Sequence, residues 1–257
     1  MKRLIATVLL AIASTTAFSK DLTTIRFGVD PTFAPFESKT ADNTLQGFDI
    51  DLGNAICAQL KAKCVWVETG FDSIIPALKA HKFDAILSAM SINETRARQV
   101  AFSDKLYLSP SRMIAKAGST LQPTPESLAG KTIGVAQGTT QEAYAKAKWA
   151  SKGVNVVSYA NQELIYPELL NGRIDATFTD SVVGDMGFLK TAQGAGYAFA
   201  GEPVKDVAFL GEGVGLGIEK SNKALIDAIN SALRAMHENG TYDAIQKKYF
   251  SFDIYNG

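Results

Sequence analysis

The chain has 257 residues, with 26 basic and 26 acidic side chains and a formal net charge of zero at pH 7. This balance argues against a nucleic-acid partner, which would favour a basic face. The length suits one large domain or two lobes of about 100 residues each.

The N-terminus indicates the compartment. Two basic residues precede an almost continuous apolar run over residues 4–13, and Ala17 and Ser19 then supply small residues at the two positions that a signal peptidase needs. This pattern is typical of a secretory signal peptide, so we predict that residues 1–19 are removed and that the protein is periplasmic. A membrane anchor needs about 20 apolar residues, so we expect no membrane span in the mature chain. No lipid anchor is expected, because the first cysteine is Cys57.

The chain contains two cysteines, Cys57 and Cys64. A secreted chain meets an oxidising compartment, which favours one disulfide between them over two buried free thiols. Two cysteines do not complete a tetrahedral zinc shell, and His81 and His237 lie in no ligand-like spacing. We therefore expect neither a metal site nor a cofactor.

The hydrophobic pattern alternates between strands and helices along the chain. The first half predicts strands over residues 25–29, 64–67 and 84–88, with helices over 51–61 and 71–80. After an extended segment over 107–115, the second half predicts strands over 132–136, 154–159 and 176–179 and helices over 140–149, 163–170, 222–238 and 242–250. Such alternation favours parallel sheets covered on both faces.

One helix–strand unit recurs in the sequence. Pro, Leu, an apolar residue, Asp and Ala stand at the same offsets in residues 76–85 and in residues 167–176. The repeat indicates two similar α/β lobes, although two ordinary helix–turn–strand units could match by coincidence. Open α/β sheets bind ligands beyond the carboxyl ends of their strands. The strand in the first unit leads to Ser88, Ala89 and Ser91, and the strand in the second leads to Asp180.

The residues near these strand ends suit a free amino acid, which carries an ammonium and a carboxylate on one carbon. A guanidinium such as that of Arg96 binds a carboxylate through two parallel hydrogen bonds. Asp180 supplies an anion for the ammonium, and residues 137–140 lie before a predicted helix whose free N–H groups favour an anion. Each element is weak alone, because Arg96 could be solvated on a surface helix and Asp180 could cap one.

The chain resembles the periplasmic lysine/arginine/ornithine-binding and histidine-binding proteins, which are family 3 solute-binding proteins of polar amino-acid ABC transporters. Length, order and spacing all fit, including the close pair of cysteines. The segments that carry the resemblance are residues 28–30, 33–36, 47–53, 71–78, 102–107, 137–144 and 159–162, and the stretch from 206 into 240–243.

The resemblance implies a type II periplasmic binding protein fold. This is an α/β fold of two lobes, each with a mostly parallel sheet flanked by helices, joined by a two-strand hinge. We expect lobe 1 to comprise residues 20–107 and 214–257 and lobe 2 to comprise residues 112–204. The hinge would lie at residues 108–111 and 205–213.

The resemblance also implies how a closing cleft would hold the α-carbon groups of an amino acid. Arg96 would clamp the carboxylate, helped by the N–H groups of Ser91 and Thr140. Asp180, the carbonyl of Ala89 and the hydroxyl of Ser91 would take the ammonium. Ala89 departs from the family pattern, since relatives often carry Ser at this position.

The ligand side chain would lie among three further residues. Asp30 would face its distal cation, while Phe33 and Phe71 would sandwich its aliphatic stem. Phe33 stands where relatives often carry Tyr. Without the resemblance, the two rings would be ordinary core residues and Asp30 a turn residue. Further contacts, some through water, are expected from Ser88, Gln141 and Asp49.

The expected function is therefore capture of a cationic L-amino acid (arginine, lysine, ornithine or histidine) for an inner-membrane ABC permease, by a protein that is itself monomeric. An enzyme is the main alternative, since periplasmic dehydratases acting on prephenate or arogenate share this architecture. Such an enzyme would need a general acid near the leaving hydroxyl. No histidine lies near the predicted cleft segments, so we expect no catalysis.

Overall fold

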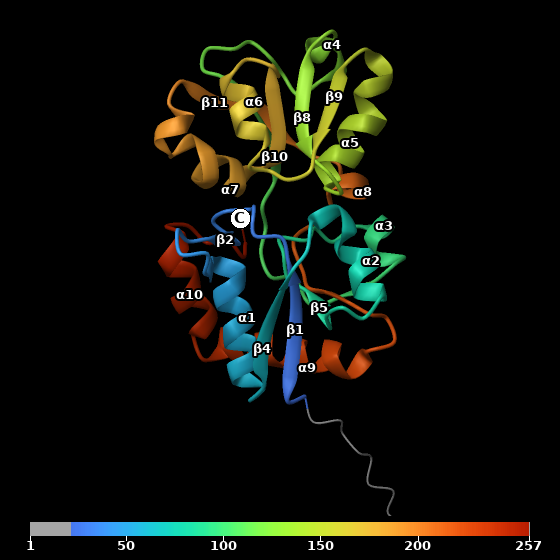
Figure 1. Cartoon of the computed structure of the whole chain (residues 1–257), viewed down its shortest axis with the longest axis vertical. Helices are drawn as coiled ribbons and strands as arrows, with labels where there is room; N and C mark the ends of the chain where they lie inside the picture. Colours follow the sequence, from blue (N-terminus) through green and yellow to red (C-terminus); the bar gives the residue numbers. More distant parts are fainter. Residues whose placement is uncertain (1–21, 257) are drawn as a thin grey trace, which may run out of the picture.

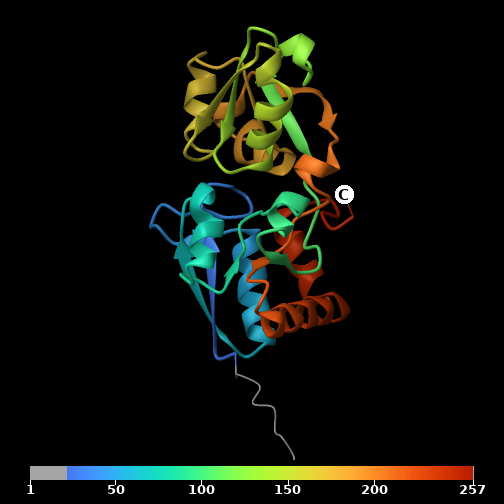
Figure 2. The ribbon, with the colours of Figure 1, turned by 90° about the vertical axis from the view of Figure 1, so that its right-hand side faces the viewer.

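Two five-stranded sheets, each with its own helices, lie one above the other in the computed structural model (Figure 1). The structure describes residues 22–256, so the predicted signal peptide at residues 1–19 lies outside the described residues. The view turned by 90° shows the connecting segments on one side of the molecule (Figure 2).

The first sheet has the strand order β4-β1-β5-β12-β6. Its strands are β1 (Thr24–Val29), β4 (Lys63–Glu68), β5 (Ala85–Ile86), β6 (Ala101–Phe102) and β12 (Gly217–Ile218). The same lobe contains the hairpin β2 (Ser38–Lys39) and β3 (Leu45–Gln46), and the helices α1 (Phe48–Gln59), η1 (Phe71–Ser73), α2 (Ile74–Lys79), α3 (Glu94–Ala97), α9 (Lys223–Glu238) and α10 (Thr241–Tyr249).

The second sheet has the strand order β11-β7-β10-β8-β9. Its strands are β7 (Ser111–Lys116), β8 (Thr132–Ala136), β9 (Asn155–Tyr159), β10 (Ala176–Asp180) and β11 (Tyr197–Val204). The helical segments between these strands and after β11 are α4 (Pro125–Leu128), α5 (Thr140–Lys148), η2 (Ala150–Lys152), α6 (Ile165–Leu170), α7 (Ser181–Gly184), η3 (Asp185–Leu189), η4 (Ala192–Gly194) and α8 (Val207–Leu210).

The two sheets have equivalent topologies. Reading the second sheet from β9 gives β9-β8-β10-β7-β11, whose pairings match those of β4-β1-β5-β12-β6 one for one. In each sheet one strand, β12 or β7, runs against the others, so both sheets are mixed. The repeated sequence unit forms α2–β5 in one lobe and α6–β10 in the other. The sequence repeat therefore reflects two similar lobes.

Most of the predicted elements are present, and the differences have local causes. The first long helix, α1, begins at Phe48 rather than at residue 51, directly after Gly47. Gly47 has φ of +133°, and a Cβ there would lie 2.2 Å from the carbonyl oxygen of Phe36, so only glycine fits this entry to the helix. The strand predicted over 84–88 is shorter: β5 covers Ala85–Ile86, and the chain adopts a left-handed conformation three residues later, at Ala89.

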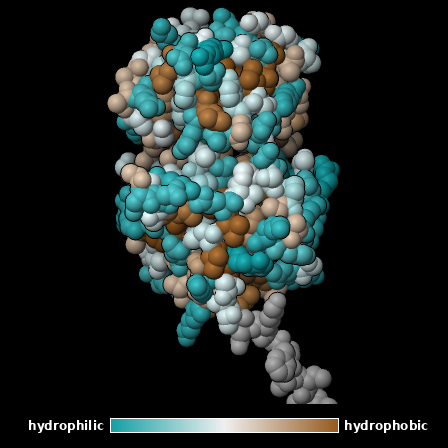
Figure 3. Space-filling view, in the orientation of Figure 1, coloured by the Kyte–Doolittle hydropathy of each residue, from teal (hydrophilic) through white to brown (hydrophobic). Residues whose placement is uncertain are grey.

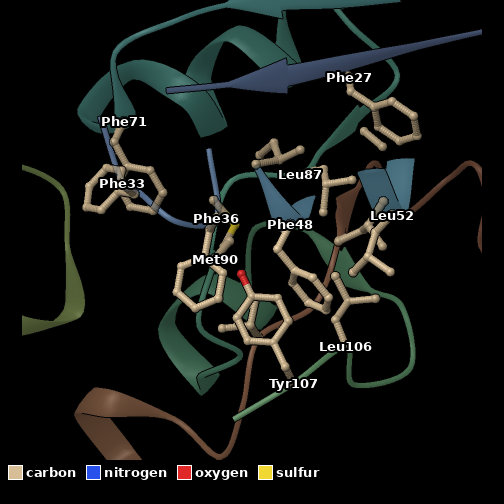
Figure 4. Packing of buried hydrophobic residues seen from close by; sticks show 14 of the residues in the cluster. Phe27, Phe33, Phe36, Phe48, Leu52, Phe71, Leu87, Met90, Leu106 and Tyr107 are labelled. Atoms are coloured by element: carbon tan, nitrogen blue, oxygen red, sulfur yellow. The ribbon is translucent and has the colours of Figure 1, made fainter. Parts of the chain in front are cut away.

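Aromatic side chains join the segment that leaves the first lobe to the centre of that lobe (Figure 4). The Phe36 ring stacks on Tyr107 with centroids 4.5 Å apart, and the edge of Phe48 meets Tyr107 at 5.5 Å. All three side chains are fully buried. Burying each such ring contributes on the order of 1.5–3 kcal/mol. This packing fixes where the chain departs toward the second sheet.

Cys57 and Cys64 form a disulfide, as predicted from the sequence. It joins the last part of α1 to the start of β4. This is the end of β4 opposite to the carboxyl ends of the strands, so the disulfide stabilises the lobe away from the facing edges of the two sheets.

Two segments connect the lobes and pair with each other at both ends. Tyr107 pairs with Val214 beside the first sheet, and Ser111 pairs with Val204 at the edge of the second.

No helix among the described residues is long and apolar enough to cross a membrane. The face in Figure 3 is largely hydrophilic, with hydrophobic residues in small separate groups.

Candidate functional site

A small cavity lies between the lobes and is lined by residues of both. Nine of the predicted site residues line it: Phe33, Phe71, Ser88, Ala89, Ser91, Arg96, Thr140, Gln141 and Asp180. Four further lining residues were not predicted: Thr139, Gln162, Phe178 and Thr179.

Arg96 places a buried positive charge in the cavity wall. The side chain of Asn93 caps α3 by accepting the N–H of Arg96 at 2.9 Å, which fixes the backbone from which the guanidinium extends. The guanidinium donates to the carbonyls of Ser91 at 2.9 Å and Gly138 at 3.1 Å, one from each lobe. It also lies 5.3 Å from the centre of the Phe71 ring. Burial lowers the pKa of Arg96 to about 10, so the group stays charged at neutral pH.

No carboxylate among residues 22–256 forms an ion pair with Arg96. Its side chain is only 7% exposed, and its two protein partners are neutral carbonyls. A buried charge with neutral partners alone is unfavourable, and a bidentate carboxylate from a ligand would compensate it. Arg96 is therefore suited to bind an anion.

Asp180 places the opposite charge in the same cavity. It ends β10 and caps α7, with Oδ1 accepting the N–H groups of Val182 at 3.0 Å and Val183 at 3.4 Å, and the hydroxyl of Ser109. Burial raises the pKa of Asp180 to about 7, against the effect of these hydrogen bonds. All three bonds go to Oδ1, so Oδ2 accepts none from the described residues. A cation from the ligand would favour the ionised form.

The floor of the cavity is the short segment after β5. Ser88 Oγ accepts the N–H of Asp30 at 2.9 Å. Ala89 has φ of +44°, a left-handed conformation that is uncommon for a residue with a Cβ. Its N–H donates to Asp49 Oδ2 at 2.9 Å. Side chains from outside the segment thus hold this floor in place.

The N-terminus of α5 forms the facing wall. Thr139 caps the helix by accepting the N–H of Glu142 at 3.1 Å, and the carboxylate of Glu142 accepts the N–H of Gly138 at 2.7 Å. This is a variant of the capping box, since Glu142 accepts the N–H of the residue before the N-cap rather than that of the N-cap itself. Thr140 and Gln141 in the first turn line the cavity, where the free N–H groups and the helix dipole favour an anion.

The two predicted stacking rings, Phe33 and Phe71, contact each other. Their centroids are 5.6 Å apart and their planes are tilted by 56°. An aliphatic stem between two rings requires a separation of about 7–8 Å, since carbon atoms meet at about 3.5–4.0 Å on each side. The predicted sandwich therefore requires the rings to move apart.

Asp30 and Asp49 are not among the lining residues. Asp30 Oδ1 accepts the hydroxyl of Thr32 at 2.9 Å, and its Oδ2 accepts the N–H of Phe71 at 3.0 Å. Asp30 thus lies behind the cavity wall, hydrogen-bonded to Phe71 and Ser88, which line it. Asp49 is fully buried beneath Ala89.

Gln162 is the most informative residue that the sequence did not indicate. It is 1% exposed, its Oε1 accepts the hydroxyl of Thr179 at 3.1 Å, and its Nε2 makes no hydrogen bond of good geometry in the described chain, with the equally unpartnered hydroxyl of Tyr166 nearby. An unpartnered amide donor at a cavity is available to a ligand. The sequence held two signals near it: Gln162 comes shortly after a predicted strand, and residues 159–162 are among the segments that carry the family resemblance.

The two lobes touch at two glycines. A Cβ on Gly138 would lie 2.6 Å from the Cα of Asp72, and a Cβ on Gly187 would lie 2.8 Å from the carbonyl oxygen of Ala34. In each pair the residues belong to different lobes. Any larger residue at either glycine would push the lobes apart.

Comparison with known proteins identifies the family. Residues 25–252 match the bacterial extracellular solute-binding proteins, family 3, and the chain belongs to this family. It is 50% identical to the lysine/arginine/ornithine-binding periplasmic protein of Escherichia coli K12, over 99% of both chains, and 47% identical to the histidine-binding periplasmic protein of the same strain, over all of both chains. An ancestral arginine-binding protein solved with arginine bound superposes with a TM-score of 0.82 at 37% identity, covering 89% of this chain and 99% of that one.

These findings confirm the expected family and the type II periplasmic binding protein fold. Both relatives are binding proteins, and both are periplasmic. The roles of the individual site residues stay predictions, since the geometry shows where they lie and not what they bind.

Gly187→Ala should shift the unliganded protein toward a more open arrangement. The added methyl overlaps Ala34 of the other lobe, and such overpacking costs about 1–3 kcal/mol. Gly187 lies in a helical turn, so alanine introduces no backbone strain. Small-angle X-ray scattering should show a larger radius of gyration. Gly70→Ala is the control, because its methyl would approach only the side chains of Asp72 and Ser73, in its own lobe. Equal radii for the two variants would contradict the lobe contact.

Proposed function

We propose that this chain is the periplasmic substrate-binding component of an ABC transporter and that it captures cationic L-amino acids. Arginine, lysine and ornithine are the principal candidates, with histidine as a further one. The observation that carries the proposal is the pair of opposite charges, Arg96 and Asp180, on the wall of one buried cavity. Arg96 has no carboxylate partner in the described chain, and Asp180 keeps one oxygen free, so the pair complements the carboxylate and ammonium of an α-amino acid.

A cationic side chain is supported by the charges around the cavity. Asp30 and Asp49 lie just behind the first-lobe side of the cavity, and Asp180 lines it from the second lobe, so three carboxyl groups surround a cavity lined by the single guanidinium of Arg96. A ligand with a second positive charge reduces this excess of acidic groups. Asp30 accepts one hydrogen bond at each oxygen, and a carboxylate has about four acceptor sites in all, so it can accept more. The names of the two E. coli relatives point to the same ligands.

We further propose that the ligand binds by closure of the lobes. Lobe 1 would be residues 20–107 and 214–257 and lobe 2 residues 112–204, with a hinge at 108–111 and 205–213. The two connecting segments allow a small change of backbone angles to move one lobe without unpacking either. The closed protein, as a monomer, would deliver the ligand to an inner-membrane permease.

Binding without turnover is the preferred proposal over a dehydratase. None of the lining residues is a histidine. Asp180 could act as an acid from its pKa alone, but its Oδ1 is committed to three donors that hold it as a helix cap. A binding protein releases arginine unchanged, and mass spectrometry of the released ligand would reveal any product.

Arg96→Ala should weaken the binding of arginine, lysine and glutamine alike. It removes a bidentate charge pair that the cavity has desolvated, and such losses cost on the order of 2–5 kcal/mol. Isothermal titration calorimetry measures the change for each ligand. Arg98→Ala is the matched control, because Arg98 is exposed on the same helix end and does not line the cavity. Normal binding of all three ligands by Arg96→Ala would show that the site is misplaced.

Asp30→Asn should separate the cationic ligands from the neutral one. It keeps the shape of the side chain but removes the charge, so arginine and lysine should lose affinity while glutamine loses little. The same titrations give the ratio of the arginine and glutamine dissociation constants in each protein. An unchanged ratio would refute the role of Asp30 and leave the α-amino-acid clamp standing.

A further inference from the structure

Two fully buried carboxyl groups lie together beneath the floor of the cavity. Glu37 precedes β2 directly, and Asp49 lies in the first turn of α1. Both are 0% exposed, and neither forms an ion pair within the described chain. Two ionised carboxylates in such a place would repel each other in a medium that screens poorly.

The hydrogen bonds of the pair occupy one oxygen of each carboxyl group. Glu37 Oε1 accepts the hydroxyl of Ser88 at 3.0 Å, and Asp49 Oδ2 accepts the N–H of Ala89 at 2.9 Å. Both Glu37 Oε2 and Asp49 Oδ1 are buried; among the described residues Glu37 Oε2 has no N–H or hydroxyl donor, and the one hydroxyl close to Asp49 is that of Tyr107. The two carboxyl groups are within hydrogen-bonding reach of each other, and a bond between them needs a proton on one.

The surroundings place that proton on Glu37. Burial raises the pKa of both acids, and the negative charge of Asp49 raises the pKa of Glu37 further. The N–H of Ala89 favours the ionised form of Asp49. The other titratable groups that act on the pair are Asp30, Asp180 and the hydroxyls of Tyr107 and Tyr242, none of which supplies a positive charge. The Tyr107 hydroxyl also favours the ionised form of Asp49, by hydrogen bonding.

The pair contacts the two residues that form the cavity floor. The hydroxyl hydrogen of Ser88 is committed to Glu37, so Ser88 presents only an acceptor to a ligand. Ala89 stays in its left-handed conformation with its N–H directed at Asp49. Loss of the shared proton would place two like charges directly behind this floor.

We propose that Glu37 and Asp49 share one proton and act as positioning residues, holding Ser88 and Ala89 in the geometry that the ligand requires. The proposal rests on the proposed function, because it takes this cavity as the amino-acid site. Neither residue touches the ligand in this account, and their effect passes through the floor.

Amide substitutions test the shared proton, with L-arginine as the probe. In Glu37→Gln the side-chain NH₂ supplies the hydrogen that the protonated acid supplies, while its oxygen still accepts from Ser88. Affinity should then be retained far better than in Glu37→Ala. Combining Glu37→Gln with Asp49→Asn places two NH₂ groups against each other. The Asp49→Asn substitution should therefore lower the affinity for arginine at least about tenfold more in the Glu37→Gln background than in the unmodified protein.

The dependence of arginine affinity on pH supplies a measurement that a purely packing role of the pair would leave unchanged. As pH rises, the unmodified protein loses the shared proton, so its arginine affinity should fall more steeply toward alkaline pH than that of Glu37→Gln, which has no such proton to lose. Any change in the protonation of free arginine with pH affects both proteins equally. Equal slopes, or binding by Glu37→Gln as poor as by Glu37→Ala, would overturn the proposal.

Failure of the proposed function can be distinguished from failure of the shared-proton proposal. If the unmodified chain binds no amino acid, the pair is tested through the free energy of unfolding. A carboxyl whose pKa is raised in the folded state stabilises the protein at low pH, and this contribution is lost as pH rises through the raised pKa. The unfolding free energy of the unmodified protein should fall across this range more than that of Glu37→Gln, and parallel profiles would refute the shared proton.

Discussion

The structure depends on one buried positive charge. The guanidinium of Arg96 lies in the cavity wall and reaches a backbone carbonyl in each lobe, yet no carboxylate of the described chain neutralises it. A charge held in this way is unfavourable in an empty site and favourable when a ligand carboxylate arrives. Closing the lobes on a ligand surrounds this ion pair with protein, and the same bond that fixes the ligand then holds the lobes together.

The equivalent topology of the two sheets explains how the opposite charges meet. The central strand of each sheet, β5 or β10, runs toward the interface and ends there. One strand end leads to Ser88 and Ala89 and, a short turn later, to Arg96, while the other ends in Asp180. Neither lobe holds both charges, so a complete site exists only when the lobes face each other. The close approach at Gly138 and Gly187 permits that arrangement.

The sequence predicted the long apolar strands and most of the site residues that follow them. The hydrophobic pattern shows where such a strand ends, and α/β proteins bind ligands beyond the strand ends. It did not predict β11, β12 or η3, whose sequences carry glycines and polar residues and take their conformation from neighbouring segments. It placed Asp30 and Asp49 at the ligand, whereas the structure places both behind the cavity wall. Their carboxylates accept N–H groups of Phe71 and Ala89, and such long-range contacts leave no trace in local pattern. Gln162 was missed for the same reason.

The role of the buried guanidinium can be tested without altering the protein. Isothermal titration calorimetry would compare L-arginine with agmatine, which keeps the distal guanidinium and lacks the carboxylate. The account predicts that agmatine binds at least about 30-fold more weakly, since it leaves Arg96 buried without a counter-charge, a loss of about 2 kcal/mol or more. Equal affinities for the two ligands would show that Arg96 does not bind the ligand carboxylate and would contradict the account.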